Sequence, residues 1–356
     1  MTFIYFVLIL GIVVFIHELG HYIFAKRARI YVYEFSLGMG PKIFKYNRKK
    51  KVKDKKGKIT YVDDETNYCI RLFPIGGFVQ MAGEEVEIDE NIPEEKRFQS
   101  KTWVSRFLTI IAGVVFNFIL AILILFIIGL LTEVSLNSTK IVNPNNELYP
   151  ALQESDRILK IEGKKINNYD RLSLELTVQG TKTFKMQVRH SDGTIENVKI
   201  TPQELKGKDI TFRDVYGFKI EGEKHHSVYG AIRYAFGKFF STLEQMFFMI
   251  LYLFTGTLSL NMLSGPVGIY NVVGQAASFG FISLLSLLAL ISINVGFINF
   301  LPLPAFDGGR ILFLIIEKIK GSPVSSKIEN TIHNIAFILL MILMLYITYN
   351  DIIRFF

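Results

Sequence analysis

The chain has 356 residues, half of them hydrophobic, and a formal net charge of +8. This share of apolar residues, gathered into runs of about 20, excludes an ordinary soluble domain and predicts membrane spans. Cys69 is the only cysteine, so the chain forms no intramolecular disulfide and cysteine spacing defines no metal site. Its start has neither a Lys/Arg-rich segment nor a small-residue cleavage site, so we expect no removable signal peptide.

Four apolar runs are long enough to cross a bilayer as helices. They are residues 3–25, 104–131, 279–301 and 332–349. A fifth apolar stretch, residues 229–258, is interrupted by charged and polar side chains. Its first half is typical of an amphipathic helix on the membrane surface. Its second half, residues 246–258, is short for a span and is compatible with either an interfacial or a re-entrant segment.

The first span contains the pentapeptide His17-Glu18-Leu19-Gly20-His21. On a helix, the two imidazoles of an HExxH motif lie one turn apart on one face, the spacing that holds a zinc ion. Glu18 follows on the adjoining face, where its carboxylate can take a proton from water. Ionisable residues at bilayer depth are costly and mark functional sites, which disfavours chance histidines. We therefore predict that His17 and His21 bind a metal and that Glu18 is the catalytic base.

The loop between the first two spans, residues 26–103, carries much of the positive charge, including the run 48–58. Such a run can bind nucleic acid, but beside a span it fits the positive-inside rule better. We expect no nucleic-acid partner, this loop in the cytoplasm, and both termini and the long loop after the second span outside. The acidic stretch 84–95 is predicted to be a solvated loop.

Alternating hydrophobicity in the same loop predicts a β-hairpin. Residues 68–73 and 75–81 have a two-residue period on either side of a Pro/Gly turn, which favours their pairing with each other. Gly76, Gly77 and Phe78 lie in the second segment. The edge of this hairpin is a candidate site for holding an extended substrate by β-addition.

A polar insert, residues 135–222, is predicted to be a small α+β domain. We expect a strand at 140–142, a strand-like segment at 156–166, a helix at 169–178 and a hairpin of 183–190 with 195–201. His190 lies beside the Asp192-Gly193 turn and is expected to be exposed. The chain then divides into residues 1–134, 135–222, 223–278 and 279–356: a membrane part, the insert, a juxtamembrane helical region and a second membrane part.

A catalytic zinc site usually has three protein ligands, and Asp307 is the best candidate for the third. It follows the third span in the segment 299–309, where Pro302, Pro304 and two glycines break the helix. A broken helix is tolerated at membrane depth only where its backbone lines a cavity or is buried in protein. Such a break can present a carboxylate to a metal.

HExxH in the first span and NxxPxPxxDG after the third closely resemble the two signatures of the site-2 protease family of intramembrane zinc metalloproteases. The resemblance covers nearly the whole chain. Further family-like motifs are residues 38–41 (GMGP), 73–79 (FPIGGFV), 113–117 (GVVFN) and 264–269 (SGPVGI). The insert is similar to the PDZ domain of the bacterial regulator-of-sigma-E branch, although one such domain is visible and residues 143–146 lack a carboxylate-binding GLGF sequence. Phe306 stands where members commonly have leucine.

The resemblance implies a zinc metalloendopeptidase in which His17, His21 and Asp307 hold Zn²⁺. Asn294 and Asn299 would position the substrate or stabilise the oxyanion, and Pro302 and Pro304 would belong to the same substrate-binding region. The implied substrates are single-span membrane proteins already trimmed outside, such as anti-sigma factors, and remnant signal peptides, cleaved within or near the membrane. Membrane lipids are the other expected partner.

The resemblance and the residue patterns together imply one architecture. It is a mainly α-helical polytopic membrane protein with four transmembrane helices, a cytoplasmic membrane-associated β-hairpin and an inserted α+β PDZ-like extracytoplasmic domain. It would lie in the bacterial cytoplasmic (inner) membrane, with its active site near the cytoplasmic side.

Two other functions stay open. A metal-handling membrane protein needs ionisable residues at matching depth in several spans, whereas this chain concentrates them in one His₂Asp set. A catalytically silent scaffold would not need the intact Glu18. Gly113 and Asn117 in the second span are interpreted as helix-packing residues, and His333 is expected at the membrane interface.

Overall fold

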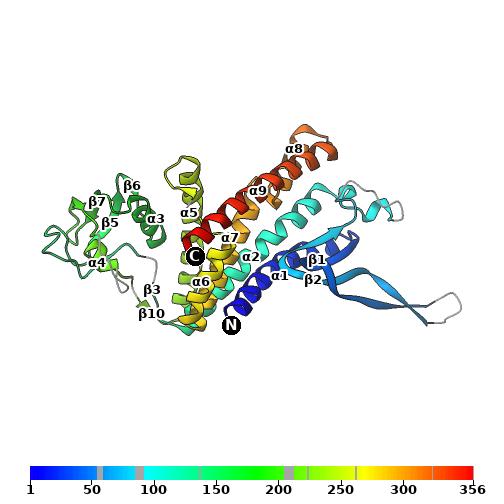
Figure 1. Cartoon of the computed structure of the whole chain (residues 1–356), viewed down its shortest axis with the longest axis horizontal. Coiled ribbons are helices and arrows are strands. Elements are labelled where there is room, and N and C mark those ends of the chain that lie inside the picture. The colour runs from blue at the N-terminus through cyan, green and yellow to red at the C-terminus, as the bar shows by residue number, and fades with distance from the viewer. Residues whose placement is uncertain are drawn as a thin grey trace. The chain divides into compact units, whose positions relative to one another are not determined.

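The computed structural model describes residues 1–53, 59–84, 92–135, 138–203, 212–222, 224–260, 263–322 and 324–355. The chain forms two compact units (Figure 1). The first consists of Met1–Ala121 and Leu263–Phe356, and the second is Ile122–Met262. The basic run 48–58 and the acidic stretch 84–95 fall partly outside the described residues.

Within this described part, four helices are long and apolar enough to cross a membrane, and they coincide with the four predicted spans. They are α1 (Thr2–Arg27), α2 (Trp103–Leu131), α7 (Phe281–Phe300) and α9 (Ser326–Phe355). The prediction of a mainly helical membrane protein is therefore confirmed. The first unit also contains α6 (Pro266–Ser278), α8 (Asp307–Lys320) and two 3₁₀ turns, η1 (Glu94–Lys96) and η2 (Phe98–Ser100).

Small residues allow α1 and α2 to approach closely. A Cβ atom added to Gly20 would lie 2.5 Å from the carbonyl oxygen of Ala112, a separation that real Cβ contacts do not reach. Helices in membranes commonly associate through small residues, which allow close van der Waals packing of their backbones. Burial of large apolar side chains contributes little there, because lipid tails are equally apolar. The close packing at Gly20 brings the face of α1 that carries His17 and His21 against α2.

Polar contacts fix the shorter helices of the first unit. Asp351 of α9 accepts hydrogen bonds from the backbone N–H groups of Gly265 (2.9 Å) and Gly268 (2.7 Å), at the N-terminus of α6. A carboxylate there complements the positive end of the helix dipole. The Trp103 indole donates a hydrogen bond to the Leu314 carbonyl (2.7 Å), which ties α2 to α8.

The β-hairpin of the first unit is present, but its strands differ from those predicted. β1 (Val32–Lys53) pairs with β2 (Ile59–Met81), and both contact α1 (Figure 1). Residues 68–73 and 75–81 were expected to pair with each other, and instead both belong to β2. Residues 34–37 of β1 pair with residues 77–80 and also with residues 67–70. The positive φ of Gly76 (+77°) lets β2 bend around the end of β1, so that β1 separates its two segments.

The second unit contains the predicted polar insert, and the expected strands and helix are found within a few residues of their predicted limits. Its elements are β3 (Val134–Ser135), β4 (Ile141–Val142), β5 (Arg157–Ile161), β6 (Lys164–Lys165), α3 (Tyr169–Gln179), β7 (Phe184–Arg189), β8 (Ile195–Ile200), α4 (Phe212–Tyr216), β9 (Lys219–Ile220), β10 (Lys224–His225) and α5 (Val228–Phe254). The largest sheet has the order β6-β5-β7-β8. Ile158, Leu172, Phe184 and Phe218 are fully buried in its core.

Helix α5 is continuous through residues 229–254, so the two halves of the fifth apolar stretch form one helix. In the described residues it is not among the helices apolar enough to count as a span. It packs on α3 through charged groups: Arg171 bonds the Tyr252 hydroxyl (2.9 Å) and pairs with the fully buried Glu175 (2.6 Å). Asp170 pairs with Lys238 of α5 at 2.5 Å. The charged groups that are buried between these helices are thus paired with groups of opposite charge.

The expectation that His190 is exposed is wrong. Its side chain is 4% exposed, with Nδ1 at 2.8 Å from the Asp156 carboxylate and Nε2 at 3.2 Å from that of Glu196. The turn at residues 192–193 directs this ring back into the unit, which the turn sequence alone did not indicate. The hydrogen bond to Asp156, followed by the one to Glu196, holds the pKa of His190 above its usual value of 6.5.

This pair predicts a pH dependence of stability. Because the folded-state pKa of His190 is raised, its stabilising contribution is complete below the unfolded-state pKa and is lost as the pH rises through the folded-state pKa. Hydrogen exchange of β7 and β8, corrected for the intrinsic rate, should show less protection at about pH 8.5 than at about pH 6. In His190→Gln the difference should disappear; an unchanged difference would contradict this assignment.

Candidate metal centre

Two histidines of α1 lie side by side in the first unit. His17 and His21 are one helical turn apart, and their Nε2 atoms are 3.2 Å from each other. Both residues are buried, with 8% of each exposed. An uninterrupted helix through the pentapeptide is what places them on one face.

Asp307 reaches the same point from the start of α8. Its Oδ2 lies 3.1 Å from His17 Nε2 and 3.3 Å from His21 Nε2. The predicted helix break is present, since α7 ends at Phe300 and α8 begins at Asp307. Glycine is required just after the aspartate: a Cβ at Gly308 would lie 2.2 Å from the Leu301 carbonyl oxygen. The tight turn between α7 and α8 therefore depends on Gly308.

These three side chains fit a zinc ion. Two imidazoles and a carboxylate are a common catalytic donor set. Tetrahedral ligands with bonds of about 2.05 Å stand roughly 3.3 Å apart, and the three separations here are 3.1, 3.2 and 3.3 Å. Among the described residues, this is the one group of three or more histidine, cysteine and acidic side chains with that proximity.

Helix α2 completes the surroundings of the imidazoles. His21 Nδ1 lies 2.9 Å from the Thr109 carbonyl oxygen, which can only accept a hydrogen bond. Nδ1 therefore carries the proton and the lone pair of Nε2 faces His17 and Asp307. A Cβ at Gly113 would lie 2.4 Å from His21 Nε2 and 2.8 Å from His17 Cε1. Gly113 therefore leaves room for both rings.

Glu18 is buried beside the β-strands. It is 9% exposed, and a Cβ at Gly77 would lie 3.1 Å from its Cγ. Gly76 precedes this contact at the bend of β2, and Phe78 follows it with the Arg71 guanidinium 4.9 Å from its ring centre. Of the predicted residues of β2, the structure thus brings Gly77 next to the predicted base.

The remaining predicted residues lie on α7 and in the turn after it. Asn294 and Asn299 are half-buried, and neither side chain hydrogen-bonds to any residue that the structure describes. Pro302 is exposed and Pro304 half-buried in the turn that precedes Asp307. None of these four residues hydrogen-bonds to the imidazoles in the described part of the chain.

Sequence reasoning missed several supporting groups. His333, expected only at the membrane interface, accepts a hydrogen bond at Nδ1 from the backbone N–H of Ala305 (3.3 Å). Ala305 has a φ of +69°, so this contact holds a strained residue two positions before Asp307. Arg310, in the first turn of α8, pairs with Glu84. The sequence signal for Arg310 was a charged residue directly after Asp307-Gly308-Gly309. No residue type in the sequence indicates that the Thr109 backbone carbonyl contacts His21.

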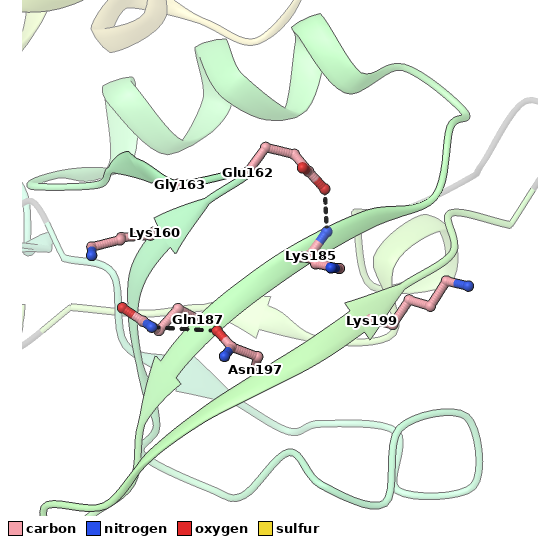
Figure 2. A pocket seen from close by; sticks show the side chains of 7 residues that line it. All are labelled: Lys160, Glu162, Gly163, Lys185, Gln187, Asn197 and Lys199. Atoms are coloured by element: carbon pink, nitrogen blue, oxygen red, sulfur yellow. Dashed lines mark hydrogen bonds between the residues drawn. The ribbon is translucent and has the colours of Figure 1, made fainter.

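A hollow lies in the second unit, on the sheet of β5, β7 and β8. Figure 2 shows the side chains that line it, which are Lys160, Glu162, Gly163, Lys185, Gln187, Asn197 and Lys199. Lys185 and Lys199 face each other across β7 and β8. The lining contains no histidine or cysteine and only one carboxylate, so it does not offer a metal site.

Comparison with known proteins identifies a family. The model of peptidase family M50 matches residues 5–343. The zinc metalloprotease RasP of Shouchella clausii is 30% identical over 439 aligned residues, which cover 100% of this chain and 99% of RasP. RasP of Bacillus licheniformis is 32% identical with the same coverage. FN1322 of Fusobacterium nucleatum is 34% identical over 364 residues, covering 100% of both chains.

The contact of Gly113 with both imidazoles gives a testable prediction. Gly113→Ala should lower zinc binding strongly, because the new methyl group occupies the space of the His21 ring. Gly11→Ala is the matched control, since a Cβ there meets nothing within 4 Å. Zinc content of the two purified variants, measured by mass spectrometry, checks this. Wild-type zinc content in Gly113→Ala would show that the rings do not bind the metal in this arrangement.

Proposed function

Since this chain belongs to peptidase family M50 and is a zinc metalloprotease, we propose that it cleaves single-span membrane proteins within or near their transmembrane segment. The observation that carries the proposal is that Asp307 of α8 meets His17 and His21 on α1, a helix apolar enough to span a membrane. A protease whose metal ligands lie along such a helix meets peptide bonds that are themselves in or next to the bilayer.

In the proposed mechanism, His17, His21 and Asp307 hold zinc. When bound, zinc supplies a Lewis acid that polarises the scissile carbonyl and makes water more acidic. Glu18 takes a proton from the attacking water as the new C–O bond forms. It then gives the proton to the amine nitrogen as the C–N bond breaks. Asn294 and Asn299 donate amide N–H groups to the substrate or to the developing oxyanion.

The depth of these residues determines where cleavage occurs. His17 and His21 lie ten and six residues before the end of α1 at Arg27, roughly 15 and 9 Å along the helix. Lys26 and Arg27 at this end, with the basic loop that follows, favour a cytoplasmic location by the positive-inside rule. The protein would thus lie in the bacterial cytoplasmic (inner) membrane and act near its cytoplasmic side. Anti-sigma factors already trimmed outside and remnant signal peptides are the substrates that fit.

Strand β2 supports a mode of substrate capture. Residues 77–80 pair with β1 along one edge, and no other strand of the described chain pairs with their second edge. Gly77 of this segment lies beside Glu18, since a Cβ added there would be 3.1 Å from Glu18 Cγ. A substrate helix must unwind to expose its peptide bonds, and the extended form can then add to this edge as a strand. Gly76, Gly77 and Phe78 would bind substrate in this way.

The second unit would act as a PDZ-like filter outside the membrane. Its sheet and helix form a separate compact unit inserted between α2 and α7. We propose that it excludes proteins with bulky outer domains, so that only trimmed substrates reach Glu18. The alignment with RasP spans 439 positions, more than the 356 residues of this chain, so RasP contains segments without a counterpart here.

Substitution of the base tests the proposed function. Glu18→Gln should keep zinc and lose at least about a hundredfold in cleavage rate, because the amide cannot take the proton. Asp307→Ala should lose zinc and activity together. Cleavage of a single-span substrate in detergent and zinc content are measured on the same preparations. Equal cleavage by Glu18→Gln and wild type would contradict the proposed role of Glu18, whereas no cleavage by zinc-loaded wild type would indicate a scaffold or a metal-handling protein.

The capture edge is tested by a pair of proline variants, Phe78→Pro and Val79→Pro. Successive N–H groups of a strand point to opposite edges, so one variant removes a bond to β1 and the other an N–H at the free edge. The free-edge variant, recognised by its wild-type thermal stability, should cleave a transmembrane substrate more slowly at unchanged zinc content. Wild-type cleavage by that variant would rule out capture by β-addition.

A further inference from the structure

Asn117 of α2 is the one buried amide that lies next to a histidine of the metal centre among the residues that the structure describes. It is completely buried, and its Nδ2 lies 3.4 Å from His17 Nδ1. Its Oδ1 is buried as well and finds no hydrogen-bond partner in the described part of the chain. A buried side-chain oxygen without a hydrogen-bond partner destabilises the folded state, so its position calls for an explanation.

The protonation of His17 supplies that explanation. Its Nε2 faces His21 and Asp307, so zinc binding through Nε2 requires the proton on Nδ1. A protonated Nδ1 is a donor and cannot bond the NH₂ group of Asn117, which also donates. Rotating the amide by 180° exchanges two groups of nearly equal size and places Oδ1 against Nδ1–H. The same rotation gives the unpaired oxygen its partner.

We infer that Asn117 is a positioning residue for zinc: its side-chain oxygen accepts the Nδ1–H of His17 and so presents Nε2 of His17 to the metal. The inference rests on the proposed function, because it assumes that His17 is a ligand. It assigns Asn117 a role beyond helix packing.

The pattern along α2 supports this role. Thr109, Gly113 and Asn117 are spaced by four residues and lie on one face of the helix. The Thr109 carbonyl accepts the Nδ1–H of His21, and Gly113 makes room for both rings between the two acceptors. With Asn117 oriented as inferred, each imidazole has one acceptor from α2. Both rings are then held in the same tautomer.

Helix α7 holds Asn117 in place. Ser292 donates a hydrogen bond from Oγ to the backbone carbonyl oxygen of Asn117 (2.8 Å). A Cβ at Gly296 would lie 2.6 Å from the Phe118 ring and 3.4 Å from Asn117 Cβ, so α7 packs tightly there. These contacts fix the backbone of Asn117, and rotating its terminal amide does not disturb them. Outer partners of this kind orient a ligand and raise its basicity.

The test measures zinc affinity by competition with a chelator, using the full-length chain in detergent. Asn117→Leu, of similar size but without an acceptor, should weaken zinc binding about ten- to hundredfold. Asn117→Asp, which can only accept, should bind zinc at least as tightly as wild type. Cobalt(II) substituted for zinc should show an altered d–d absorption spectrum in Asn117→Leu and a wild-type-like spectrum in Asn117→Asp.

Thr132→Val, just after the end of α2, is the control. It removes a half-buried hydroxyl that bonds the Ile128 carbonyl, fifteen residues beyond Asn117, so zinc affinity should not change. Wild-type affinity in Asn117→Leu would overturn the inference. If that variant does not fold, Asn117→Asp decides alone, because weakened binding there means that Asn117 donates to His17. Absence of zinc from the wild-type protein would instead overturn the proposed function.

Discussion

The arrangement of the first unit depends on the cost of placing two imidazoles and a carboxylate among apolar helices. Ionisable groups at that depth are expensive unless they are paired with one another or with a cation. His17, His21 and Asp307 meet this constraint by converging within 3.3 Å of one another from two separate helices. A metal ion at their meeting point would offset the cost for all three. The helix break before Asp307 and the close approach of α1 and α2 both serve this convergence.

Glycine is the means by which the chain achieves it. Gly20 lets α1 lie on α2, Gly113 clears space for the rings, and Gly308 lets α8 start against the end of α7. Gly77 brings β2 to Glu18 in the same way. Gly20 and Gly308 let backbone approach backbone, and Gly113 and Gly77 let backbone approach side chains of α1. Such close packing suits a membrane because it does not depend on expelling water. The proposed ligands, the proposed base and the proposed capture segment are thus positioned by residues that carry no chemistry of their own.

Much of this fold could be predicted from the sequence because the strongest signals are periodic. Runs of about 20 apolar residues marked the four spans, and HExxH fixed the spacing of His17 and His21. The pairing of β1 with β2 could not be predicted, because alternation identifies strands but not their partners. The burial of His190 depends on Asp156, far away in sequence, and the acceptor for His21 is a backbone carbonyl of Thr109, which leaves no trace in residue type. Local patterns therefore identified the donor set, whereas the contacts that orient it required the three-dimensional arrangement.

We propose that His17, His21 and Asp307 together hold one zinc ion. X-ray absorption at the zinc edge of the purified full-length protein measures whether they do. We expect one zinc per chain, with two imidazoles and oxygen ligands at about 2.0 to 2.2 Å. In Asp307→Asn, weaker binding should be accompanied by a changed oxygen contribution with both imidazoles retained. A set of zinc ligands without imidazole, or one that is unchanged by substitution of His17 and His21, would show that these histidines do not bind zinc.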